Sequence, residues 1–181
     1  MVTERISLIG LRGSGKTTIA RLLADRLGWS WCDADHVLEE RYGKTIRQIF
    51  DEEGETSFRD KETAILRELA TRSHCVIATG GGVVLRPENR VQLKTGVTIW
   101  LTAAPRLLWE RMQADTTTAQ RRPNLAHGGL AEIEETLRIR QPLYEACADW
   151  TVDTTAPMPE QVAEQILTWL QGRGAVDILK S

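Results

Sequence analysis

The sequence has few cysteines, and the three it has are far apart. Cys32, Cys75 and Cys147 form no CxxC pair, which argues against a zinc site and against a disulfide framework. Sparse, unpaired thiols are typical of proteins from a reducing compartment. We therefore expect the fold to be stabilised by its core rather than by cross-links.

Long apolar stretches and an excess of one charge are also missing. Nowhere do eighteen apolar residues follow one another, so we expect no membrane span. The N-terminal MVTERISLIG lacks the apolar region of a signal peptide, which predicts a cytoplasmic protein. The net charge of −2 and the pI near 6.0 argue against a nucleic-acid partner. Any basic cluster should then be local and serve a small anionic ligand.

The length and composition indicate one ordinary globular domain. The 181 residues suffice for a sizeable core, and neither repeats nor low-complexity tracts divide them. The contents of 41% hydrophobic and 27% charged residues are typical of such proteins. We expect a single domain over residues 1–181. We also expect a monomer, because no long apolar stripe is left over for a partner.

Short apolar runs alternate with helical patterns, which is typical of an α/β fold with a parallel sheet flanked by helices. The expected strands are Ile6–Ile9, Ser30–Asp33, Cys75–Thr79, Val97–Leu101 and Trp150–Asp153. The expected helices are Lys16–Leu27, Thr45–Glu53, Glu55–Arg72, Pro87–Leu93, Pro105–Gln113, Ala131–Ala148 and Glu160–Gln171. In such a sheet, ligands bind at the C-terminal ends of the strands.

The stretch LIGLRGSGKTTI, residues 8–19, contains a phosphate-binding pattern. Gly10-x-x-x-x-Gly15-Lys16-Thr17 matches the P-loop and lies between an expected strand and an expected helix. Its glycines let backbone N–H groups close around an anion, and the helix N-terminus adds a positive dipole end. Lys16 would reach the β- and γ-phosphates, and the Thr17 hydroxyl would bind Mg²⁺. The residues expected to bind the nucleotide are Gly13, Ser14, Gly15, Lys16, Thr17 and Thr18.

Two carboxylates follow the second expected strand. Asp33 and Asp35 are two residues apart, so on an extended chain both side chains would project to the same side. One could then support the metal ion while the other reaches a substrate hydroxyl. Alternatively, Asp35 is the N-cap of a helix that begins at His36. The spacing alone leaves both possibilities open.

An arginine and three glycines form the next candidate site. Arg59 lies on an expected helix at ion-pairing distance from Glu55 and Glu62. It is either one half of a surface ion pair or a grip for a substrate carboxylate, with Glu62 holding it in place. Gly80–Gly82 follow directly on an expected strand, which favours a close approach of the backbone to a ligand.

One long polar segment interrupts the α/β pattern. Residues 115–129, DTTTAQRRPNLAHGG, have no periodicity and are basic at Arg121 and Arg122. A loop of this length inside a compact domain is either a functional lid or disordered, and we favour the lid. Arg140, on the expected helix that follows, is a further cation near Pro142.

These motifs, taken together, resemble the shikimate kinase family over nearly the whole chain. The matching segments are GLRGSGKTT (10–18), DADHVLEERYGKTIRQIFDEEGETSFRDKE (33–62), IATGGGVVL (77–85), RRPNL (121–125) and RQPLYEACAD (140–149). The resemblance implies a three-layer P-loop NTPase fold with strand order 2-3-1-4-5. It also implies a substrate-binding segment at about 34–62 and a lid at about 115–129.

The same resemblance implies an activity and a substrate site. The activity is ATP-dependent phosphorylation of the 3-hydroxyl of shikimate, in aromatic amino-acid biosynthesis through chorismate. Asp35 would contact the ring hydroxyls and orient or deprotonate the attacking one. Arg59 and Arg140 would bind the shikimate carboxylate, and the backbone of Gly80, Gly81 and Gly82 would line the pocket.

The nucleotide side follows from the same resemblance. Lys16 and Arg122 would neutralise charge on the transferring phosphoryl group, and Asp33 would support Mg²⁺ together with Thr17. Pro159 would contact the adenine, and Arg111 resembles the arginine that stacks on it. Asn124 stands where the family's lid usually has leucine.

Two other functions are compatible with a P-loop in this chain. One is a small-molecule kinase of the same fold that acts on gluconate or on a nucleoside monophosphate. The other is a regulatory module that binds ATP and has no phosphoryl acceptor. The combination of F-R-x-x-E with three glycines favours shikimate over the acceptors of the first alternative.

Overall fold

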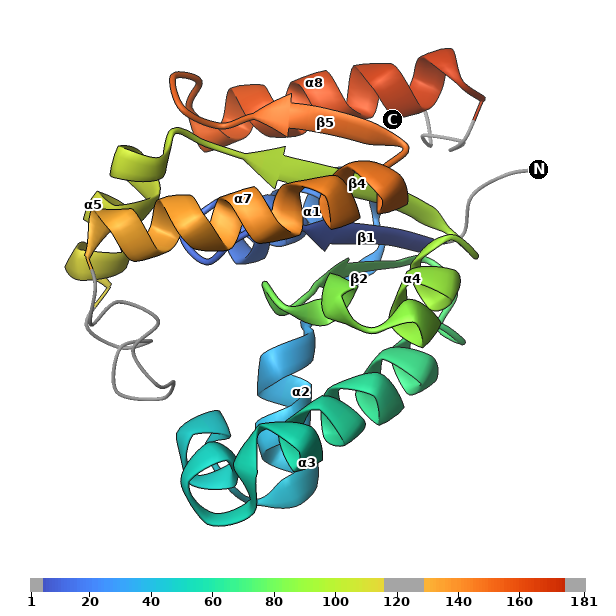
Figure 1. Ribbon diagram of the computed structural model, residues 1–181. Helices are drawn as coiled ribbons and strands as arrows, with labels where there is room; N and C mark the ends of the chain where they lie inside the picture. The colour runs from blue at the N-terminus through green and yellow to red at the C-terminus, as the bar shows by residue number, and fades with distance from the viewer. Residues whose placement is uncertain (1–4, 116–128, 175–181) are drawn as a thin grey trace.

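The computed structural model describes residues 5–115 and 129–174, which form one twisted sheet with helices on both faces (Figure 1). All strand pairs are parallel, in the order β2-β3-β1-β4-β5 that the resemblance implied. The strands are β1 (Arg5–Ile9), β2 (Ser30–Asp33), β3 (Cys75–Ala78), β4 (Val97–Thr102) and β5 (Trp150–Asp153). The expected strands are confirmed to within one residue at either end.

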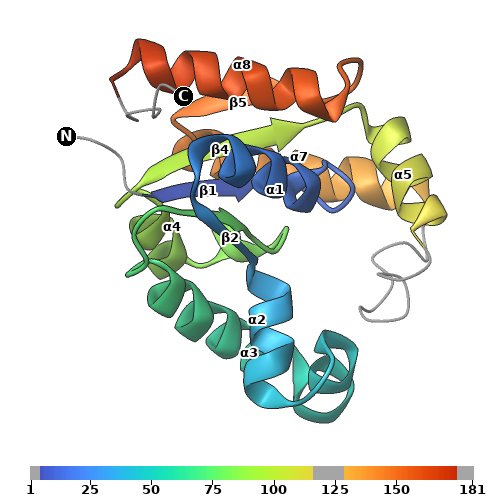
Figure 2. The same ribbon diagram turned by 180° about the vertical axis from the view of Figure 1, so that it is seen from behind.

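Helices α1 and α8 cover one face of the sheet, and α4 and α7 cover the other (Figures 1 and 2). The helices are α1 (Lys16–Leu27), α2 (Ala34–Tyr42), α3 (Ile46–Leu69), α4 (Pro87–Leu93), α5 (Pro105–Ala114), α7 (Leu130–Cys147) and α8 (Pro159–Gly172), with a 3-10 turn η1 (Val83–Leu85). The end of α2 and the first turns of α3 extend beyond the edge of the sheet (Figure 1), whereas the later part of α3 packs with β2 and β3 in the core. Among the described residues, no helix is both long and apolar enough to cross a membrane.

The central strand is buried on both faces, as expected for a parallel strand between two layers of helices. Every residue of β1 is buried. Ile6 and Leu8 pack toward α1 and α8, whereas Ile9 packs with Trp100 and Tyr144 under α7. This double-sided core fixes the C-terminal edge of the sheet, where the loops that carry the candidate residues begin.

Helix α3 joins the two helices expected on either side of residue 54. Gly54 lies inside it with φ 83° and ψ 172°, so the helix bends there. A positive φ is easily adopted only by glycine, which explains the residue at the bend. Beyond Gly54, Ile65, Leu66 and Leu69 are buried against the body of the protein. The bend thus directs the first part of α3 toward α2 while the second part stays on the core.

Candidate active site

The loop between β1 and α1 has the geometry of a phosphate-binding loop. Gly10 has φ 139°, and a Cβ there would lie 2.3 Å from the Leu101 carbonyl oxygen. Gly15 has φ 94° and caps the N-terminus of α1. Lys16 Nζ donates to the carbonyl oxygens of Gly10 (2.8 Å) and Leu11 (3.0 Å), so the ammonium lies folded over the loop. The N–H groups of this loop and the N-terminus of α1 therefore direct positive charge toward the same point.

A cavity of about 300 Å³ lies over this loop and contains both expected metal ligands. Thr17 Oγ1 donates to Asp33 Oδ2 at 2.7 Å. A hydroxyl and a carboxylate at the phosphate end of a nucleotide site are the oxygen donors that Mg²⁺ uses alongside water. The residues that line the cavity are Arg12, Gly13, Gly15, Lys16, Thr17, Thr18, Asp33, Asp35, Thr79, Gly81, Arg111 and Asp115.

Asp33, not Asp35, caps the helix that follows β2. Asp33 Oδ1 accepts hydrogen bonds from Asp35 N (3.0 Å) and His36 N (3.4 Å), and α2 begins at Ala34. The alternative of Asp35 capping a helix that begins at His36 is therefore wrong. The extended-chain argument is also wrong, since Asp35 lies in the first turn of α2. Both carboxylates nevertheless line the cavity over the phosphate-binding loop.

A second cavity, of about 290 Å³, contains Arg59 and Arg140. It lies between α3 and the glycine triplet, and it shares Arg12 and Gly81 with the first cavity. Its lining residues are Arg12, Ile46, Phe50, Glu55, Phe58, Arg59, Glu62, Gly81, Gly82 and Arg140. Apolar and aromatic walls around the guanidinium groups of Arg12, Arg59 and Arg140 suit a small ring that bears a carboxylate.

The pair of Arg59 and Glu62 is buried, so the surface ion-pair alternative is wrong. Arg59 Nη1 contacts Glu62 Oε2 at 2.7 Å, and their side chains are 13% and 7% exposed. Burial raises the pKa of Glu62, and the positive charge of Arg59 opposes that rise. Glu55, by contrast, is 64% exposed and contacts Arg59 at 3.3 Å. Glu62 thus holds the guanidinium in place beside the cavity.

The glycine triplet leaves room for both arginines. A Cβ on Gly82 would lie 2.4 Å from Arg59 Nη1, and one on Gly81 would lie 3.7 Å from Arg140 Nη1. Gly80 accepts a hydrogen bond from Val83 N (3.2 Å), which begins the turn η1. Any side chain at position 82 would therefore occupy the place of the Arg59 guanidinium.

Replacing Gly82 by alanine should impair substrate binding without unfolding the protein. The new methyl group meets only the end of the flexible Arg59 side chain, and φ at Gly82 is an ordinary −98°. A displaced guanidinium should raise the KM for the carboxylate substrate by about tenfold or more. Steady-state kinetics and thermal melting measure both effects. Gly172→Ala, where nothing lies within 4 Å, is the matched control, and an unchanged KM would separate Arg59 from substrate binding.

Tyr144 is a site residue to which the sequence assigned no role. Its hydroxyl donates to the Gly81 carbonyl oxygen, and its ring stacks on Trp100 with centroids 5.5 Å apart. Burial raises the pKa of Tyr144 to about 12, so the hydroxyl keeps its proton at neutral pH. The R-x-P-L-Y motif carries this residue, but spacing alone does not reveal that α7 fixes the glycine triplet through it.

Tyr144→Phe should lower the free energy of unfolding by about 1–3 kcal/mol, because it leaves the buried Gly81 carbonyl without this donor. The ring and its stacking on Trp100 are retained, so packing should change little. Urea unfolding followed by tryptophan fluorescence measures the difference. Stability equal to that of the parent protein would mean that another donor satisfies Gly81.

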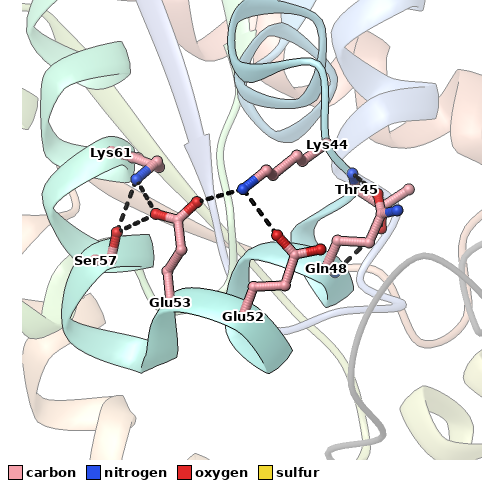
Figure 3. Close-up of polar contacts among 7 residues, drawn as sticks. All are labelled: Lys44, Thr45, Gln48, Glu52, Glu53, Ser57 and Lys61. Carbon is pink, nitrogen blue, oxygen red and sulfur yellow. Dashed lines mark hydrogen bonds and ion pairs between the residues drawn. The ribbon is translucent and has the colours of Figure 1, made fainter.

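An exposed ionic network spans the bend in α3 (Figure 3). Glu53 accepts from Lys44 (2.9 Å), Lys61 and Ser57 (2.7 Å), and Lys44 also contacts Glu52 at 2.8 Å. The network therefore links the turn between α2 and α3 to both halves of α3. The contacts lower the pKa of Glu53 to about 2, with the Lys61 hydrogen bond as the largest cause.

This lowered pKa predicts an acid-sensitive contribution to stability. A carboxylate with a depressed folded-state pKa stabilises the fold above its unfolded value of 4.5, and the contribution is lost as the pH falls toward 2. The stability difference between the parent protein and Glu53→Gln should therefore be largest near pH 7 and shrink through that window. Unfolding curves between pH 7 and 2.5 measure it. A difference independent of pH would contradict the assignment.

A third hollow, of about 220 Å³, continues from the phosphate-binding loop toward α8. It is lined by Gly13, Ser14, Gly15, Thr18, Ile19, Arg111, Thr154, Pro157, Pro159 and Val162. Arg111 donates to Gly13 O (3.2 Å) and to Thr154 O (2.9 Å), which ties the loop to the segment before α8. Arg111 and Pro159 thus both border the space where the rest of a nucleotide would extend.

An expected feature and an unexpected one stand apart from this set. Arg122 and the expected lid's other basic residue, Arg121, lie outside the described residues, which resume at Gly129. Arg12 is the opposite case, since it borders both the cavity over the phosphate-binding loop and the cavity of Arg59 and Arg140, although no role was expected for it. No sequence signal distinguished it, because the x positions of the P-loop pattern accept any residue.

The comparisons with known proteins agree with this geometry. The family model "Shikimate kinase" matches residues 12–171. A shikimate kinase of Cupriavidus pinatubonensis is 44% identical over 178 residues, which is 96% of this chain and 91% of the relative. A solved structure of shikimate kinase from Acinetobacter baumannii in complex with shikimate has TM-score 0.88 and 36% identity, and the match covers 94% of each chain.

The likeness to a kinase of the rival class is weaker. A gluconokinase from Sinorhizobium meliloti has TM-score 0.58 and 18% identity over 95% of this chain and 94% of its own. Similarity at this level of identity reflects the shared fold alone, so it gives no support to gluconate as the acceptor.

Proposed function

The chain belongs to the shikimate kinase family, and on that premise we propose that it transfers the γ-phosphoryl group of ATP to the 3-hydroxyl of shikimate. The products are ADP and shikimate 3-phosphate, a step toward chorismate and the aromatic amino acids. One observation carries the proposal: the cavity that contains Arg59 and Arg140 adjoins the cavity over the phosphate-binding loop. If Arg59 and Arg140 hold the carboxylate of shikimate in their cavity, the shikimate ring lies beside a phosphate held in the cavity over the loop.

The nucleotide half of the site is assigned to the loop between β1 and α1. Its backbone N–H groups and Lys16 bind the phosphates of ATP, and Arg111 and Pro159 border the adenosine. Thr17 and Asp33 would hold Mg²⁺, which neutralises phosphate charge when bound. Their 2.7 Å contact supports this pairing. Lys16 changes partners from the loop carbonyls to the phosphates as the nucleotide enters.

The acceptor half is assigned to the second cavity. Arg59, oriented by Glu62, and Arg140 bind the ring carboxylate, and Gly80, Gly81 and Gly82 supply the close backbone wall. Asp35 accepts hydrogen bonds from the ring hydroxyls and takes the proton of the attacking one. Burial of the Arg59–Glu62 pair supports this role, because a guanidinium fixed before binding loses little freedom on binding.

Positioning and charge neutralisation are the main requirements of phosphoryl transfer. Lys16 meets part of the second requirement, and Arg122 is assigned the rest. That role for Arg122 is supported by the RRPNL motif alone, and the kcat of an Arg122→Ala variant tests it. Exclusion of water by the segment about 115–129 would suppress hydrolysis of ATP.

The remaining assignments concern the whole chain. The family model covers most of its length, which supports a single domain over residues 1–181 with a substrate-binding segment at about 34–62. The net charge of −2 supports the absence of nucleic-acid and membrane partners. We further propose a monomeric, cytoplasmic enzyme, because the three free, buried cysteines suit a reducing compartment and the sequence leaves no long apolar stripe for a partner.

An ADP-release assay with different acceptors tests the proposed function. The protein, ATP and Mg²⁺ are incubated with shikimate, gluconate, AMP or no acceptor. Release that depends on shikimate is expected. ADP release that depends on gluconate or AMP would identify that compound, and not shikimate, as the acceptor. ADP release without any acceptor, or no ADP release at all, would favour a regulatory nucleotide-binding module.

A further inference from the structure

Arg12 occupies the boundary between the phosphate cavity over the loop after β1 and the acceptor cavity of Arg59 and Arg140. It lies in the phosphate-binding loop, two residues after Gly10, and lines both the acceptor cavity and the phosphate cavity. Gly81 is shared in the same way, but it has no side chain. The Arg12 residue is only 9% exposed. A buried guanidinium therefore stands where the two substrates would meet.

The surroundings of Arg12 leave hydrogen-bonding capacity unused. Within residues 5–115 and 129–174, its Nε is buried and donates no hydrogen bond. Burial lowers the pKa of Arg12 and the charge of Asp115 opposes that shift, yet an arginine remains protonated in proteins. A buried cation with an unused donor is costly unless an anion satisfies it. The position thus calls for an anionic ligand at the cavity boundary.

We propose that Arg12 is a further catalytic residue, which donates hydrogen bonds to the phosphoryl group during its transfer and then to the phosphate of the product. This inference rests on the proposed function. The acceptor oxygen forms a bond to the γ-phosphorus while the bond from that phosphorus to the β,γ-bridging oxygen breaks. The electron pair leaves with ADP, and the hydroxyl proton passes to Asp35.

Arginine suits this position for a geometric reason. Its planar fork donates two parallel hydrogen bonds to a phosphate, whereas lysine acts as a point charge. Lys16 approaches the phosphates from the loop side, where its Nζ lies against Gly10 and Leu11. Arg12 stands on the acceptor side, so together they place positive charge at both ends of the path that the phosphoryl group follows.

The test compares a phosphorylated ligand with an unphosphorylated one. Arg12→Gln and Arg12→Lys are assayed for kcat, and their Kd values for shikimate and shikimate 3-phosphate are measured by calorimetry with ADP present. Arg12→Gln should lower kcat and raise the Kd of shikimate 3-phosphate, each by about 10–100-fold. The Kd of shikimate should change less than about threefold, and Arg12→Lys should recover part of the loss. Arg106→Gln, an exposed arginine on α5, is the matched control.

The alternative is that Arg12 only braces the loop against Asp115. In that case Arg12→Gln would weaken both ligands equally and lower the Tm, and the lysine variant would behave like glutamine. That pattern, or an unchanged kcat of Arg12→Gln when the parent protein is active, would overturn the Arg12 proposal but not the proposed function. If Arg12→Gln does not fold, the Kd values of Arg12→Lys for shikimate and shikimate 3-phosphate are compared instead. Equal weakening of both ligands overturns the proposal, and weaker binding of shikimate 3-phosphate alone supports it. A parent protein that never phosphorylates shikimate would overturn the proposed function as well.

Discussion

Asp35→Asn should lower kcat by about 10²–10⁴-fold, which is the usual loss when a general base is removed. Asparagine has nearly the shape of aspartate but does not take the proton of the attacking hydroxyl. The fold should tolerate the change, because the cap of α2 is Asp33 and not Asp35. The KM for shikimate should rise less than kcat falls, since an amide still bonds to ring hydroxyls. Steady-state kinetics with saturating ATP separates the two parameters.

The control for this prediction lies on the same helix. Glu40→Gln removes a carboxylate that is 67% exposed and lies 3.2 Å from His36, so kcat should stay at the parent value. A kcat for Asp35→Asn within a few-fold of the parent protein would exclude proton transfer to Asp35. The carboxylate would then serve only to orient the ring.

Arg59→Ala should raise the KM for shikimate by at least about thirtyfold, with little change in the KM for ATP. Truncation of a buried partner in a charged pair costs about 2–5 kcal/mol, and every 1.4 kcal/mol is a factor of ten. Part of that cost comes from Glu62, which is left buried beside the empty position. The double variant Arg59→Ala/Glu62→Gln removes this charge and should recover stability but not affinity.

A surface arginine on the same helix provides the comparison. Arg47 is 55% exposed and lies 3.8 Å from Asp51, so Arg47→Ala should leave both KM values unchanged. A higher KM for ATP with an unchanged KM for shikimate would place Arg59 on the nucleotide side instead. The cavity assignment would then be wrong.

The parts of the fold that depend on local pattern were predictable from the sequence. The P-loop spacing and the buried run before it located the loop between β1 and α1 and its helix, because glycine freedom and helical periodicity are properties of neighbouring residues. The strand order is different, since it depends on contacts between distant segments. It came from the resemblance to a family rather than from any residue pattern.

The contacts that complete the site were not predictable for the same reason. Neither the Tyr144 bond to Gly81 nor the position of Arg12 between the cavities leaves a signature in nearby residues. The capping of α2 shows a further limit. Asp33 and Asp35 are both good caps, and only the direction in which the chain leaves β2 decided for Asp33.

The wall that the phosphate cavity and the acceptor cavity share has a consequence for inhibitor design. Because Arg12 and Gly81 border both spaces, one molecule with a ring carboxylate at one end and a phosphate chain at the other needs only a short spacer. Once its first end is seated, the second end meets its own subsite at an effective concentration on the order of millimolar. Such a bisubstrate compound should bind more tightly than either fragment and should compete with both substrates.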